Sequence, residues 1–88
     1  MENSKLIKLL KSLSKQEIIR LKELVNSPYF NKNRNVMNLC EEILNFYPGF
    51  NSIEFTEENI YKKLFGSLTF DYFKIKNIIS DLYGLAVT

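Results

Sequence analysis

Apolar residues recur along most of this chain at intervals of three and four positions, which is the spacing of an amphipathic helix. The pattern covers residues 4–12, 15–26, about 34–46 and 57–65, and a last segment that begins at about 70 to 72 and continues to 86. Glycine and proline are few, which favours helices over a turn-rich β fold. The pattern therefore predicts an all-α fold, a compact bundle of about five helices and not a long coiled coil.

Capping residues mark the expected helix starts. Ser14 and Glu17 stand at capping-box spacing, in which each side chain accepts a hydrogen bond from the other residue's backbone N–H. The other expected caps are Asn33 or Asn31 for the third helix, Thr56 for the fourth, and Thr69 or Asp71 for the fifth. Pro28 and Pro48 are expected to end the second and third helices. Gly66 is expected to end the fourth helix in a left-handed conformation.

The apolar stripes also predict which side chains form the core. The third helix carries the widest stripe, so we expect it to be central and contacted from two sides. Cys40 lies inside that stripe and is expected to be an inert, buried thiol. The expected core comprises Leu6, Leu10, Ile18, Leu21, Val25, Phe30, Val36, Leu39, Cys40, Ile43, Ile60, Leu64, Phe65, Ile75, Ile79 and Leu82.

The segment 27–33, Ser-Pro-Tyr-Phe-Asn-Lys-Asn, combines a turn signal, two adjacent aromatic residues and a basic residue. Tyr29 and Phe30 lie outside a regular helix, and we expect at least one of them to fill the core between helices. The alternative is that an exposed ring beside Lys32 and Arg34 stacks on a nucleic-acid base.

Charge is distributed unevenly in a chain whose net charge is only +2. Residues 1–34 contain eight basic and three acidic residues, whereas residues 41–58 contain five acidic residues and no basic one. Such a pattern is typical of solvated helix faces, and it also suits a partner surface. The candidate partner-binding residues form two patches, Tyr29, Lys32 and Arg34 in the first, and Lys62, Lys63, Lys74 and Lys76 in the second.

Catalytic chemistry is not indicated. The chain has no histidine, and its single cysteine lies in an apolar stripe without a base beside it. The adjacent pairs Glu41–Glu42 and Glu57–Glu58 diverge by about 100° on a helix and do not form a carboxylate dyad. Phosphate loops, dinucleotide fingerprints and metal-ligand spacings are missing from the sequence. We therefore expect neither an enzyme nor a bound cofactor or metal.

Length and hydropathy place the chain among small cytoplasmic modules. Eighty-eight residues predict one domain, 1–88. Neither a secretory signal nor an apolar run of ~18 residues is seen, so we expect a cytoplasmic protein that does not enter a membrane. The apolar segment 84–88 suggests the N-terminal module of a longer protein.

Two functions from different classes fit these features. The first is a protein-interaction or scaffolding module, whose partner is another region of the same chain or another protein. The alternative is a DNA-binding helix-turn-helix formed by residues 57–86, with Lys74 and Lys76 near the start of the recognition helix. Phe70, Tyr72 and Phe73 stand there in place of residues that read base edges, which disfavours the alternative. The sequence does not specify an oligomeric state.

Four segments together resemble the N-terminal region of a family of long uncharacterised bacterial proteins. The segments are 13–17, 27–33, 60–65 and 80–82, and the Ser-Pro-Tyr-Phe-Asn-Lys run is the most specific of them. The resemblance spans nearly the whole chain and implies that a helical region follows it. It implies no catalytic residues, because the family carries no established activity.

Overall fold

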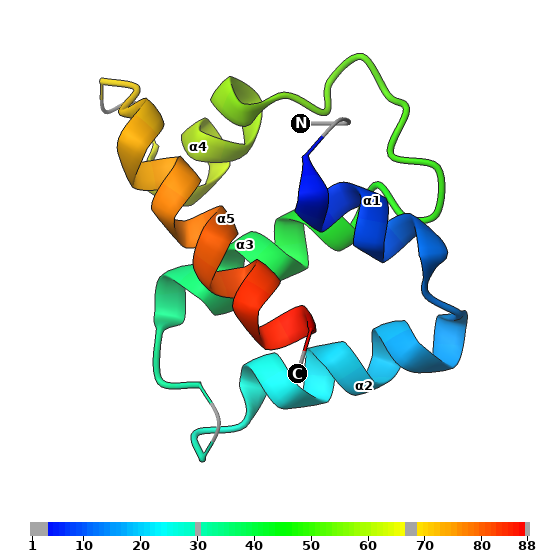
Figure 1. The fold of residues 1–88 in the computed structure, drawn as a ribbon. Helices are drawn as coiled ribbons and strands as arrows, with labels where there is room; N and C mark the ends of the chain where they lie inside the picture. The colour runs from blue at the N-terminus through cyan, green and yellow to red at the C-terminus, as the bar shows by residue number, and fades with distance from the viewer. Residues whose placement is uncertain (1–3, 30, 67–68, 88) are drawn as a thin grey trace.

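The computed structural model describes residues 4–29, 31–66 and 69–87. Over these residues the chain forms five α-helices and no strand (Figure 1). The helices are α1 (Lys5–Ser12), α2 (Lys15–Asn26), α3 (Arg34–Leu44), α4 (Glu57–Phe65) and α5 (Tyr72–Ala86). The all-α prediction is confirmed. The third helix ends at Leu44, two residues before the expected Phe46, and passes into a turn over 45–49.

Two helices organise the fold. Helix α5 contacts each of the other four, and α3 contacts α2, α4 and α5. Figure 1 shows α5 running across the front of α3, with α1, α2 and α4 arranged around this pair. The expectation of a central third helix is therefore confirmed, and α5 shares that position. The radius of gyration is 12.3 Å, close to the value of about 12 Å for a compact chain of this length.

The helix starts follow the capping chemistry of the sequence. Glu17 N donates to Ser14 Oγ at 3.2 Å, and Ser14 N donates to Glu17 Oε1 at 2.9 Å, which completes the capping box. Of the alternatives left open by the sequence, Asn33 caps α3 and Asp71 caps α5. Each cap accepts a backbone N–H that has no partner within its own helix.

The end of α4 differs in detail from the expectation. Gly66 has a positive φ of 72°, as predicted, but its ψ of −140° lies outside the left-handed helical region. This combination is close to the backbone region that is essentially restricted to glycine. Its N–H still donates to the Lys62 carbonyl at 2.7 Å, so the last turn of α4 is closed.

Most of the expected core is buried. The confirmed residues are Leu6, Leu10, Ile18, Leu21, Val25, Val36, Leu39, Cys40, Ile43, Ile60, Ile75 and Leu82. Leu64, Phe65 and Ile79 were also expected in the core, but they are only partly buried, since they pack on its outer side. Phe30 lies outside the described residues.

Five core residues were not predicted, namely Ile7, Phe50, Phe55, Tyr61 and Ile78. Two of them belong to the segment between α3 and α4, which carries no helical periodicity. The Phe50 side chain is fully buried, and its ring centroid lies 5.5 Å from that of Phe55. Phe50 also has a φ of 52°, an uncommon conformation for a bulky residue. The connection therefore folds inward and contributes two rings to the core.

Candidate interaction surface

The first predicted patch lies on the connection between α2 and α3. The side chains of Tyr29, Lys32 and Arg34 are exposed, and Tyr29 retains 86% of its accessible surface. In Figure 1 this connection lies at the lower left, whereas α4 and the start of α5 lie at the upper left. The two predicted patches are therefore separate surfaces.

Asn31, a candidate helix cap within the segment 27–33, helps to hold this connection in place. Asn31 is the one buried polar residue among those described. Its Nδ2 donates to the Val25 carbonyl at 2.8 Å, and its Oδ1 accepts from Asn33 N at 3.1 Å. The Asn31 amide joins the end of α2 to the cap of α3. This residue of the segment 27–33 therefore has a structural role.

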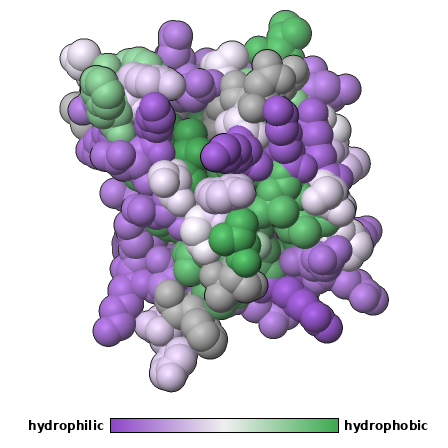
Figure 2. Space-filling view, in the orientation of Figure 1, coloured by the Kyte–Doolittle hydropathy of each residue, from purple (hydrophilic) through white to green (hydrophobic). Residues whose placement is uncertain are grey.

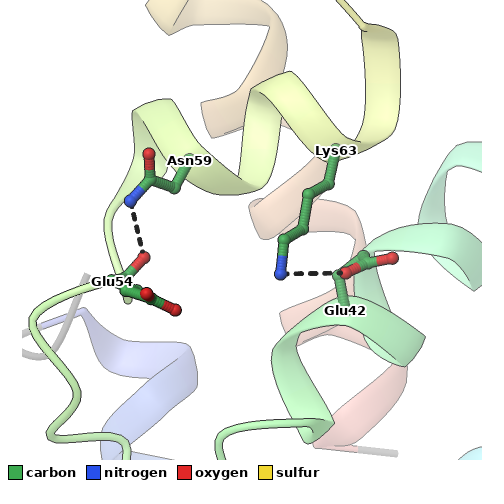
Figure 3. Close-up of polar contacts among 4 residues, drawn as sticks. All are labelled: Glu42, Glu54, Asn59 and Lys63. Carbon is green, nitrogen blue, oxygen red and sulfur yellow. Dashed lines mark hydrogen bonds and ion pairs between the residues drawn. The ribbon is translucent and has the colours of Figure 1, made fainter.

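The lysines of the second predicted patch do not all point the same way. Lys63 turns towards α3, where its Nζ lies 3.9 Å from Glu42 Oε2 (Figure 3). It also lies 5.6 Å from the Phe46 ring centroid. On the same helix, Asn59 Nδ2 donates to the Glu54 carbonyl at 2.9 Å (Figure 3). These contacts attach α4 to its neighbours, while Lys62 remains on the exposed side.

Lys74 and Lys76 lie at the start of α5 and contact aromatic rings. Lys74 Nζ is 4.1 Å from the Phe65 ring centroid, and Lys76 Nζ is 5.7 Å from that of Tyr72. Ammonium groups at such positions are attracted to the negative face of the ring. Both lysines stay exposed, so their charges remain accessible to a partner.

Three aromatic side chains accompany these lysines. Phe70, Tyr72 and Phe73 expose 39%, 48% and 74% of their surfaces. The Tyr72 and Phe73 rings contact each other edge to face, with centroids 6.0 Å apart. We refer to the surface formed by Phe70, Tyr72, Phe73, Lys74 and Lys76 as the α5 corner.

The local sequence explains why the Tyr72 and Phe73 rings are exposed. Asp71 Oδ1 accepts from Lys74 N at 3.1 Å and fixes Tyr72 as the first residue of α5. Successive helix positions diverge by about 100°, so Tyr72 and Phe73 cannot both face the core that Ile75 occupies. Two adjacent aromatic residues at a helix start are thus a sequence signal for an exposed ring.

A hollow of about 260 Å³ lies beside the α5 corner, between the start of α1, the start of α4 and α5. Its lining residues are Ser4, Lys5, Leu6, Glu57, Tyr72, Lys76, Ile79, Ser80 and Tyr83. Tyr72 and Lys76 belong both to the hollow and to the corner. Figure 2 shows a further apolar area over the C-terminal half of α5, framed by polar groups.

Reactive chemistry is sparse in the described part of the chain. Burial raises the pKa of the Cys40 thiol from its ordinary value of 9.0 to about 11, so the thiol is protonated at neutral pH. Within residues 4–29, 31–66 and 69–87, groups of three or more histidine, cysteine or acidic side chains that could hold a metal ion are not found. None of the five described helices has the length and apolar character needed to cross a membrane.

Comparison with known proteins adds no relative: no family model, curated protein or solved structure matches this chain. The resemblance to a family of long bacterial proteins therefore stays a prediction.

Proposed function

We propose that this chain is a helical protein-interaction module and that the α5 corner is its partner-binding surface. The observation that carries the proposal is the 74% exposure of Phe73 beside the half-exposed Tyr72. Large aromatic side chains are enriched at protein interfaces, because their burial supplies much of the binding energy. The patch Tyr29, Lys32 and Arg34 offers one ring whereas the corner offers three, so the corner is the stronger candidate.

Charge supports a partner with acidic residues. Lys74 and Lys76 flank the exposed rings, and neither forms an ion pair with another described residue. Carboxylates placed beside an apolar anchor would meet these ammonium groups at the rim of the contact. Rim charges mainly raise the association rate and set specificity, while the rings supply the apolar contact.

Site-specific photo-crosslinking in cells tests the proposal. A photoreactive phenylalanine analogue is placed at position 73, and the matched control places it at Ile53, an apolar residue that is 94% exposed. We expect a discrete, protease-sensitive adduct from position 73 that is absent from position 53. Equal labelling from both positions, or none from position 73, would contradict the proposal.

DNA binding by residues 57–86 is the second candidate. The exposed positions of Lys74 and Lys76 on the first turns of α5 favour it. Against it, residues 66–71 separate α4 from α5, whereas the turn of a helix-turn-helix has three or four residues. Lys76 also lies over the Tyr72 ring, so a base does not have free access to both faces of that ring.

Fluorescence anisotropy with a random DNA duplex, titrated at several salt concentrations, separates the two candidates. Micromolar affinity that falls steeply with salt concentration would indicate several phosphate contacts and favour DNA. Lys74→Gln and Lys76→Gln would then each reduce the salt dependence. Absence of binding at ~50 mM salt, where such contacts are strong, would leave the protein-interaction module.

A further inference from the structure

The hollow beside the α5 corner has an apolar floor. Leu6 of α1 is buried at its base, and the partly buried Ile79 and Tyr83 of α5 line its side. A volume of about 260 Å³ is smaller than the pockets of ~300–1,000 Å³ that take drug-sized ligands. The space therefore suits one large side chain or a small aromatic acid, and not a nucleotide cofactor.

The rim of the hollow is mainly basic. Lys5 and Lys76 are exposed at its edge, and neither forms an ion pair with another described residue. Lys8 and Lys11 continue from Lys5 along the exposed side of α1 at intervals of three residues. Glu57 is the one acidic residue among the described lining residues, and it lies in the first turn of α4. Because Lys5 and Lys76 are positively charged and only Glu57 is negatively charged, the described lining residues carry a net positive charge.

We propose that this hollow binds an apolar side chain of a partner protein whose neighbouring carboxylate pairs with Lys5 and Lys76. The inference deepens the proposed function and rests on it, because Tyr72 and Lys76 belong to both surfaces. The α5 corner would contact the surface of the partner, and the hollow would take one anchoring residue. Charge complementarity at the rim selects an acidic segment over a neutral or basic one.

Indole-3-acetate is a suitable probe, because it joins an aromatic ring to one carboxylate. The matched probes are 3-methylindole, which lacks the charge, and tryptamine, which reverses it. Titrations of the isotope-labelled chain are followed through its amide resonances by NMR. We expect saturable shifts at Leu6, Ile79, Ser80 and Tyr83, with a Kd of about 1 mM for the acid, as suits a ligand of this size. The neutral probe should bind more weakly and the amine most weakly.

Two charge variants test the roles assigned to the lysines. Lys5→Gln and Lys76→Gln should each weaken indole-3-acetate about two- to fivefold, the range for one partly exposed ion pair, and leave 3-methylindole unchanged. Lys62→Gln is the matched control, because this exposed lysine of α4 does not line the hollow. The amide spectrum of each variant shows whether the fold is intact.

Failure of this inference is distinguishable from failure of the proposed function. Equal affinity for the acid and the amine, shifts outside the hollow, or no saturable shift would each overturn the inference. Crosslinking from position 73 does not depend on the probe, so an adduct there would leave the interaction module standing. Loss of that adduct together with loss of probe binding would contradict both.

Discussion

At the scale of single residues, Asn31 is the one polar residue that is buried among those described. Its amide is buried and satisfies backbone groups at Val25 and Asn33. A buried backbone group that loses its partner costs more than the hydrogen bond itself contributes, because it is also deprived of water. The Asn31 side chain therefore ties the end of α2 to the cap of α3.

Asn31→Ala should lower the free energy of unfolding by about 1–3 kcal/mol, measured by urea denaturation. Asn26 is the matched control, since its Nδ2 also donates to a backbone carbonyl, that of Lys22 at 2.7 Å, but on the exposed surface. Asn26→Ala should stay within about 0.5 kcal/mol of the wild type. Equal losses from both substitutions would contradict the role assigned to Asn31.

Cys40 makes stability depend on pH in the alkaline range. Burial is the main cause that raises the pKa of its thiol to about 11, and Lys22 opposes the shift while Glu41 adds to it. A group whose pKa is raised by folding stabilises the native state below its unfolded pKa. That contribution is lost as the pH rises from about 9 through about 11.

The expected loss from Cys40 is of the order of 2–3 kcal/mol across this interval. Urea unfolding at about pH 8 and about pH 11 measures this loss, and Cys40→Ala is the reference that lacks the thiol. The variant should lose less stability over the interval than the wild type. Equal losses would show that the thiol does not titrate with folding.

At the scale of the helices, replacing either of two glycines with alanine should change the stability of the chain, and the two changes should have opposite signs. Gly66 has backbone angles that only glycine adopts easily, so Gly66→Ala should cost about 1–3 kcal/mol. Gly84 lies inside α5, and an added Cβ there would meet nothing within 4 Å. Gly84→Ala should therefore stabilise the chain by about 0.5–1 kcal/mol. Thermal unfolding of both variants checks the pair, and a loss at Gly84 would show that its flexibility is required.

The helices could be predicted from the sequence because their signals are local. Capping residues, a period of three to four, and proline or glycine at the ends depend only on neighbouring positions. The burial of Phe50 and Phe55 is different, since both lie between helices where no periodicity assigns a face. The Tyr47 hydroxyl donates to the Leu13 carbonyl at 3.1 Å, a contact across 34 positions that also has no local signal.

The candidate surface could be predicted only in part from the sequence. Lysine positions are visible in the sequence, but their partners are not. Lys63 contacts Glu42 and Phe46 of other segments, whereas Lys74 and Lys76 remain exposed over aromatic rings. In the sequence, the aromatic residues at the start of α5 argue against DNA binding but do not by themselves predict an exposed surface. Their exposure depends on where α5 begins relative to the core.

At the scale of the whole molecule, the folded chain leaves a group of large apolar rings outside its core. The described core already includes residues from all five helices and from the connection before α4. Phe73 does not belong to that core, and its exposure of 74% means that folding removes little of its surface from water. A small protein that keeps such a ring exposed gains little stability from it and is more prone to associate.

Phe73→Ser should therefore leave the free energy of unfolding within about 0.5 kcal/mol of the wild type, measured by urea denaturation. The same substitution should raise the solubility of the chain in ammonium sulfate, because it removes an exposed ring from the α5 corner. Ile75→Ser is the contrasting variant, since Ile75 lies two positions further along α5 and is fully buried. It should destabilise the chain by several kcal/mol, on the order of 2–5. A large loss of stability from Phe73→Ser would mean that the ring serves the fold, and the α5 corner would then lose its main anchor for a partner.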